Sequence, residues 1–66
     1  MDQYELLKVR KKLGLSAREM AVVMGANYQT FKKWQNGERN MTGTSVKCIE
    51  LLLAIKGTET GKKFGV

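Results

Sequence analysis

The chain has 66 residues, which allows one domain with a small hydrophobic core and leaves no room for a buried active-site cavity beside it. Twelve Lys and Arg against six Asp and Glu give a net charge of +6, which favours a polyanionic partner, with nucleic acid ahead of an anionic membrane. One cysteine and no histidine exclude an internal disulfide and a zinc site. We therefore expect no enzyme, no metal, no cofactor and no small-molecule ligand.

The N-terminus is polar and acidic, and no apolar run approaches the roughly twenty residues that a membrane span requires. These features predict a soluble, cytoplasmic protein.

Apolar residues recur at three- and four-residue spacing and proline is absent, which predicts an all-α domain. Four helices are expected, over residues 2–13, 16–24, 27–36 and from Thr42 or Thr44 to about residue 56. Gly14, Gly25 and Gly37 stand where the first three should end. Ser16 and Glu19 have the spacing of a capping box at the start of the second helix.

The last ten residues differ from the rest in composition. Residues 57–66 contain three glycines and two lysines and show no helical period. The sequence therefore predicts a helical domain over residues 1–56, followed by a tail that is mobile or associated with a dimer.

The third expected helix has two chemically different sides. Phe31 and Trp34 fall on one side, at helical spacing. The other side is polar and basic and holds Tyr28, Gln29, Lys32 and Lys33. The helix before it carries small or flexible packing residues such as Ala21, and Gly25 allows a tight turn between the two. This arrangement predicts a helix-turn-helix whose second helix offers its polar side to the DNA major groove.

The spacing from Ala21 through Gly25 to Phe31 and Trp34, closed by an asparagine-glycine pair, resembles the helix-turn-helix of the phage lambda repressor and Cro superfamily, often called the Xre family. The resemblance covers residues 3–56. It implies a compact four- to five-helix domain, usually dimeric, that binds double-stranded operator DNA and controls transcription in a bacterial or phage-infected cell. Very small members include phage Cro-like regulators, antitoxins and autorepressors associated with anti-CRISPR genes.

Position by position, the resemblance implies base contacts on the first turn of the third helix and one turn further, at Asn27, Tyr28, Gln29 and Lys33. Their chemistry agrees, because the Gln29 amide can pair with adenine and the Lys33 ammonium can donate to guanine. Phosphate contacts are expected at Ser16, Arg18, Lys32, Asn36, Arg39, Asn40 and Arg10.

Two positions depart from the family pattern. Many members have a glutamine at the start of the second helix, where this chain has Ala17, so Ser16 or Arg18 must supply that phosphate contact. The glutamate that usually follows the tryptophan is Gln35 here. Arg10 therefore lacks a partner and is either free for phosphate or solvated.

Several of these residues also have purely structural explanations. Lys32 and Lys33 suit an ordinary solvated face, and Arg10 with the two lysines after it compensates a helix dipole. Asn36 is first of all a helix C-cap residue. Cys48 is a small apolar group, because nothing near it in sequence would activate a thiol.

The fourth expected helix is apolar on two sides. Val46, Ile49, Leu52 and Leu53 form a stripe for the core, whereas a second stripe holds Cys48, Leu51 and Ile55. We expect this second stripe, with Phe64 of the tail, to form a homodimer interface. The alternative is that the tail alone covers the stripe in a monomer.

These observations predict a homodimeric, sequence-specific DNA-binding repressor that binds an inverted-repeat operator, because the chain shows no second domain for sensing or activation. The alternative from another class is an antitoxin or adaptor whose main role is binding a protein partner through the tail and the second stripe. RNA binding through the same basic side is less favoured, because the deep, narrow major groove of RNA does not admit a helix.

Overall fold

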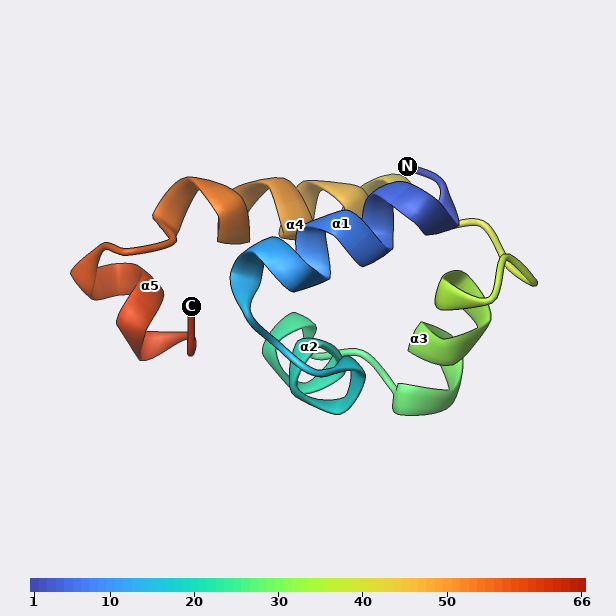
Figure 1. Cartoon of the computed structure of the whole chain (residues 1–66), viewed down its shortest axis with the longest axis horizontal. Coiled ribbons are helices and arrows are strands. Elements are labelled where there is room, and N and C mark those ends of the chain that lie inside the picture. The colour runs from blue at the N-terminus through green and yellow to red at the C-terminus, as the bar shows by residue number, and fades with distance from the viewer.

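The computed structural model describes all 66 residues and contains five α-helices and no strand, which confirms the all-α prediction. The helices are α1 (Gln3–Leu13), α2 (Ala17–Met24), α3 (Tyr28–Gln35), α4 (Gly43–Ile55) and α5 (Glu59–Lys63). In Figure 1, α1 and α4 run in the same direction along one side of the molecule, α2 and α3 lie on the other side, and α5 lies at the end remote from α3. None of the five helices combines the length and the apolar character needed to cross a bilayer.

Local signals in the sequence define the ends of the first four helices. Four side chains accept a backbone N–H of the first turn, those of Asp2, Ser16, Asn27 and Thr42. In α2, the N–H of Glu19 donates to Ser16 Oγ at 3.1 Å and the N–H of Ser16 donates to Glu19 Oε1 at 2.9 Å, which is the predicted capping box. Gly25 and Gly37 have φ of 69° and 76°, a conformation that other residues rarely adopt, and they end α2 and α3. The predicted boundaries of these four helices are confirmed to within one or two residues.

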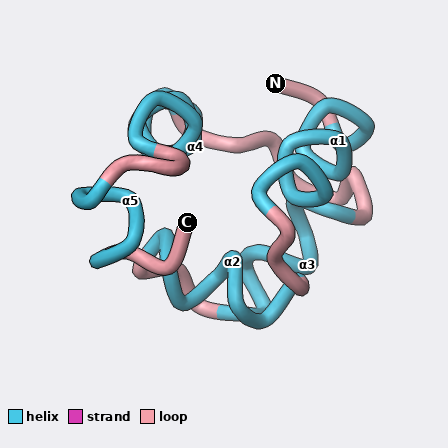
Figure 2. The backbone as a smooth tube through the Cα atoms, turned by 60° about the vertical axis from the view of Figure 1, so that its left-hand side comes forward, coloured by secondary structure: helices cyan, strands magenta, loops and turns pink.

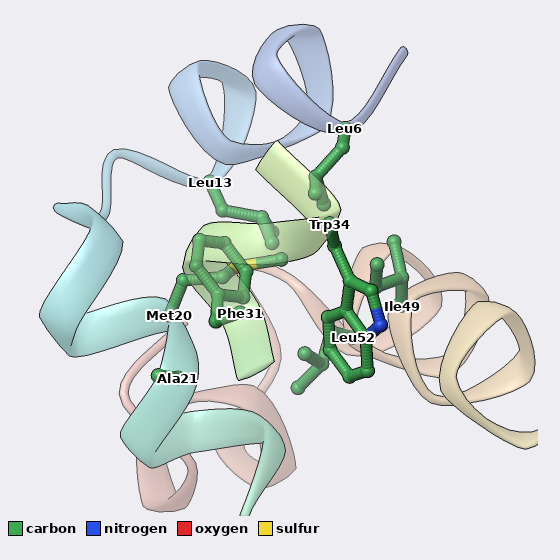
Figure 3. Close-up of a cluster of buried hydrophobic side chains, with 8 residues drawn as sticks. All are labelled: Leu6, Leu13, Met20, Ala21, Phe31, Trp34, Ile49 and Leu52. Atoms are coloured by element: carbon green, nitrogen blue, oxygen red, sulfur yellow. The ribbon is translucent and has the colours of Figure 1, made fainter. Parts of the chain in front are cut away.

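The core consists of eight buried apolar side chains from α1 to α4 (Figure 3), namely Leu6, Leu13, Met20, Ala21, Phe31, Trp34, Ile49 and Leu52. The rings of Phe31 and Trp34 meet edge to face, with centroids 6.2 Å apart and planes at 69°. Phe31 has no exposed surface, and burying an aromatic side chain of this kind stabilises the fold by about 2 to 3 kcal/mol. The core thus holds one side of α3 and leaves its other side outward.

Residues 57–66 contain a helix, so the expectation of a tail without helical structure is wrong. Thr58 caps α5 by accepting the N–H of Gly61 at 3.0 Å, and its hydroxyl donates to the carbonyl oxygen of Ile55 at 2.6 Å. Gly61 is buried, and a Cβ there would clash with the same carbonyl. The N–H of Val66 donates back to the carbonyl of Gly61 at 2.8 Å. A glycine that suggests an irregular tail in the sequence is therefore a close contact between α4 and α5.

Candidate nucleic-acid interface

The outward side of α3 is exposed, polar and basic. Gln29, Lys32 and Lys33 are exposed, while Phe31 and Trp34 on the opposite side are buried. The helix contains no acidic residue. The single ion pair of the protein joins Lys47 Nζ and Glu50 Oε2 at 3.1 Å, on α4. Neither Lys32 nor Lys33 therefore forms an ion pair with a carboxylate of the protein.

The four predicted base-contact residues lie on the first two turns of α3 but have different surroundings. Asn27 is exposed and caps the helix, because its Oδ1 accepts the N–H of Gln29 at 2.8 Å, so that only its amide nitrogen remains to donate. The side chains of Gln29 and Lys33 are exposed and make no hydrogen bond within the protein. Tyr28 is half-buried and lies beneath two cations. Three of the four residues are thus free to meet a ligand from the outward side of α3.

Most of the predicted phosphate-contact residues surround α3 at its two ends. Ser16 and Arg18 belong to the start of α2, and the Arg18 Cζ lies 4.3 Å from the centroid of the Tyr28 ring, which brings α2 next to α3. Asn36, Arg39 and Asn40 are exposed in the connection from α3 to α4. Lys32 is exposed on α3 itself. Six of the seven predicted side chains are therefore exposed at the start of α2, on α3 or in the connection that follows α3.

The connection after α3 is held against α1. Asn36 is the C-cap of α3, and its N–H donates to the carbonyl of Lys32 at 2.9 Å, so the structural role expected for it is confirmed. A Cβ at Gly37 would clash with the side-chain carbonyl of Gln3 on α1. The Gln3 carboxamide is the far end of a flexible side chain, so it is the positive φ of Gly37 that favours glycine here. The N–H groups of Glu38 and Arg39 donate to the carbonyl of Lys33 at 2.9 and 3.2 Å, which ties the backbone of Arg39 to the last turn of α3.

Arg10 differs from the other predicted phosphate ligands, because the structure places it partly inside the domain. It is half-buried, and its Nη1 donates to the carbonyl of Leu15 at 3.0 Å. Its Nε is buried without a hydrogen-bond partner, as is the Oε1 of Gln35. Arg10 therefore supports the connection between α1 and α2, so the expectation that it has no partner within the protein is wrong, whereas its phosphate contact stays a prediction.

One acidic side chain lies beside the predicted phosphate ligands of α2. The carboxylate of Glu19 accepts the Ser16 N–H, and hydrogen bonding to the Ser16 backbone and then to its side chain lowers the pKa of Glu19. Glu19 is therefore ionised at neutral pH, and its negative charge interacts favourably with the positive end of the α2 dipole. Its charge also opposes an anion at that end of the helix, which leaves Arg18 as the stronger candidate for phosphate at α2.

A second surface feature is an apolar groove of about 510 Å³ between α2, α4 and α5. Its apolar lining consists of Val23, Cys48, Leu51, Leu52, Ile55 and Phe64. Leu51 and Phe64 remain 65% and 54% exposed, so the tail does not cover the stripe within one chain. Figure 2 shows α5 and the C-terminus between α4 and α2, and a Cβ at Gly65 would lie 3.7 Å from Val23 Cγ2. The structure thus gathers all four predicted dimer residues at one groove.

Val23 of α2 is a groove residue that the sequence reasoning did not select. The sequence indicates it through the adjacent pair Val22-Val23, because two neighbouring residues of a helix cannot both face the same side. Val22 is 78% exposed, whereas Val23 is half-buried against the core and the groove. Val23 therefore lines the groove together with the second apolar stripe of α4.

No group of three or more His, Cys, Asp or Glu side chains lies close enough together to hold a metal ion. Comparison of the chain with protein-family models, with curated proteins and with solved structures finds no match.

Proposed function

We propose that this protein is a sequence-specific DNA-binding regulator of the lambda repressor and Cro superfamily. One observation carries the proposal. The outward side of α3 presents Gln29, Lys32 and Lys33 without any acidic residue, while Phe31 and Trp34 anchor the same helix in the core. A rigid helix with one buried side and one basic, amide-bearing side has the size and chemistry that the major groove of B-DNA accepts.

In this proposal the residues have separate roles. Gln29 and Lys33 contact base edges, and Asn27 donates from its amide nitrogen at the start of α3. Backbone phosphates are bound on either side of α3, by Ser16, Arg18, Lys32, Asn36, Arg39 and Asn40. The base contacts set the sequence preference, and the phosphate contacts set the register and most of the affinity.

We further propose that the protein acts as a homodimeric repressor. A second copy of the chain would cover the apolar groove and the exposed Leu51 and Phe64 across a two-fold axis. Two α3 helices would then enter major grooves one helical turn apart, about 34 Å, which requires an inverted-repeat operator. Occupation of a promoter blocks polymerase without any further domain, so repression is the simplest mode of regulation.

Selection of binding sites from a random duplex library with the purified protein, at about 150 mM salt, tests this function, because counterion-driven background binding falls steeply with salt. We expect enrichment of an inverted repeat, with a spacing between half-sites that reports the geometry of the dimer. Weak, salt-sensitive binding without any enriched sequence would contradict the proposal.

The apolar groove favours a second candidate function, that of an antitoxin or adaptor that binds a protein partner. An exposed leucine and phenylalanine beside a hollow of this size are features of protein-binding surfaces as well as of dimers. Deletion of residues 57–66 discriminates between the two functions. A DNA regulator keeps basic DNA binding through α3, whereas an adaptor loses its partner.

A further inference from the structure

Arg18, Tyr28 and Lys32 form a cluster at the place where α2 meets α3. The Arg18 Cζ lies 4.3 Å from the centroid of the Tyr28 ring, and the Lys32 Nζ lies 5.7 Å from it. Both distances are within the roughly 6 Å over which an aromatic ring attracts a cation. Tyr28 is half-buried and packs against the core, while the two basic side chains are exposed. One ring that is fixed by the core therefore holds two cations from two helices.

The two cations have no anionic partner in the protein. The one ion pair is that of Lys47 and Glu50 on α4. Glu19 is adjacent to Arg18 in sequence, but its carboxylate is bound to the backbone N–H of Ser16. Two positive charges held at one ring repel each other, and an anion that bridges them removes this repulsion. The two cations over the Tyr28 ring could therefore both be paired by one bound anion.

We infer that Tyr28 is a positioning residue, whose ring holds Arg18 and Lys32 as a two-cation clamp for one DNA backbone phosphate, and that Tyr28 itself reads no base. The inference rests on the proposed DNA-binding function and changes the role of one of its residues. The ring is occupied by cations and held by the core, so its contribution is to keep Arg18 and Lys32 ordered before DNA arrives. A guanidinium and an ammonium ordered in this way bind phosphate with less loss of side-chain entropy.

Substitution of the ring separates positioning from base reading. Binding to the selected operator and to a random duplex is measured over a range of salt concentrations for the wild type, Tyr28→Phe and Tyr28→Leu. We expect Tyr28→Phe to bind like the wild type, because it keeps the ring and loses only the hydroxyl. Tyr28→Leu should weaken binding to both duplexes equally, by about threefold to tenfold. Its plot of log affinity against log salt should be less steep by up to about one unit, as expected for one phosphate contact.

Two results would overturn the inference. A loss of operator preference in Tyr28→Phe would show that the hydroxyl reads a base. An unchanged salt dependence in Tyr28→Leu would show that the ring does not act through phosphate. Lys8→Gln is the control for the salt dependence, because it removes one exposed cation of α1 that is far in sequence from the cluster and should leave the salt slope unchanged.

A double-mutant cycle tests whether Tyr28 acts through Arg18. We expect the loss of affinity in Arg18→Gln/Tyr28→Leu to be smaller than the product of the two single losses, because part of what the ring supplies is an ordered Arg18 guanidinium. Losses that simply multiply would show that the two side chains act independently and would overturn the inference.

A titration without DNA distinguishes failure of the clamp from failure of the proposed function. If the wild type prefers no duplex sequence, the proposed function fails, and inorganic phosphate is titrated into the protein while NMR follows the Arg18 Nε–Hε and Lys32 Nζ signals. We expect both signals to shift together in the wild type and in Tyr28→Phe, and to shift less in Tyr28→Leu. The absence of a common shift in the wild type would overturn the clamp itself.

Discussion

The α2–α3 surface and the apolar groove at α4 and α5 differ in what each leaves unsatisfied. On α3, Lys32 and Lys33 are exposed without an acidic partner. In the groove, Leu51 and Phe64 are exposed without an apolar cover. The first surface has the chemistry to bind a polyanion and the second to bind another apolar surface, and both adjoin the eight-residue core. In a domain this small, two binding surfaces can share one core and still be altered separately.

This separation has a consequence for affinity. In a dimer formed through the groove, a substitution in the groove lowers DNA affinity only because the second half-site is lost. A substitution on α3 lowers the affinity of each protomer directly. Core residues affect both surfaces, so informative substitutions lie outside the core.

The largest effect is expected for Leu51→Lys, which puts a charge into the groove. Two copies would then face each other with a buried cation on each side, so the dimer should dissociate at micromolar concentration. Operator affinity should fall by about 100-fold, because each half-site is bound alone, although added positive charge by itself favours DNA. Sedimentation and operator titration measure the two quantities.

Val22→Lys is the control for this substitution. Val22 is an exposed apolar residue of α2 that does not line the groove. The same added charge there should leave the dimer intact and should not reduce operator affinity. Equal behaviour of the two variants would contradict the assignment of the groove to dimerisation.

The next effect concerns base reading on α3. Gln29→Ala and Lys33→Ala should each cost about 1 to 3 kcal/mol on the operator and relax the preference at a single base pair. Arg39→Ala should weaken operator and random DNA alike, because a phosphate contact carries no sequence information. Competition binding with single-base operator variants measures both effects. Equal losses on operator and random DNA for all three variants would remove the basis for base reading by α3.

A smaller effect is expected from Gly61→Ala, which tests the packing of α5. Its Cβ would clash with the Ile55 carbonyl, so α5 must shift, at a cost of about 1 to 3 kcal/mol in the free energy of unfolding. Dimerisation should weaken with it, because Phe64 moves. Gly43→Ala on α4 is the control, since a Cβ there meets nothing within 4 Å and should stabilise the helix by about 0.5 to 1 kcal/mol. Thermal unfolding that is the same for both variants would contradict the role of Gly61.

Much of the fold follows from local patterns in the sequence. Helices α1 to α4 could be predicted because their caps are side chains such as Ser16 and Asn27 and their ends are glycines, and each of these acts within a few residues. The burial of Phe31 and Trp34 follows from helical spacing alone. Because these contacts join residues that are close together in the chain, they can be recognised from the sequence.

Contacts that depend on how the chain turns and packs after a helix end could not be predicted in the same way. Helix α5 depends on Gly61 fitting against the end of α4, and composition alone suggests an irregular tail. Arg10 donates to the carbonyl of Leu15 in the connection between α1 and α2, and a basic residue in the last turn of a helix gives no sequence signal for such a contact. The Arg18 guanidinium over Tyr28 comes from a neighbouring helix, so the sequence of α3 alone does not show that this ring lies under it. In each case the packing of helices decides the role of the residue.

The smallest expected effect concerns the pH dependence of the α2 capping box. The pKa of Glu19 is lowered in the folded protein, first by the hydrogen bond from the Ser16 backbone. A carboxylate with a lowered pKa stabilises the fold above its unfolded pKa, and this contribution is lost as the pH falls through the folded value. Glu19→Gln keeps an acceptor for the Ser16 N–H but cannot titrate. We therefore expect the wild type to lose more thermal stability than Glu19→Gln when the pH falls from about 6 to about 3.

Glu19→Gln also tests whether a charge at α2 affects DNA affinity more than a charge near the groove does. Glu19→Gln removes a negative charge adjacent in sequence to Arg18, so DNA affinity at neutral pH should rise slightly, by about twofold or less, for operator and random DNA alike. Glu59→Gln at the start of α5 removes an acidic charge of the same kind near the groove, and it should change DNA affinity less than Glu19→Gln does. An equal rise in both variants would mean that only net charge matters, and it would argue against a specific phosphate site at the start of α2.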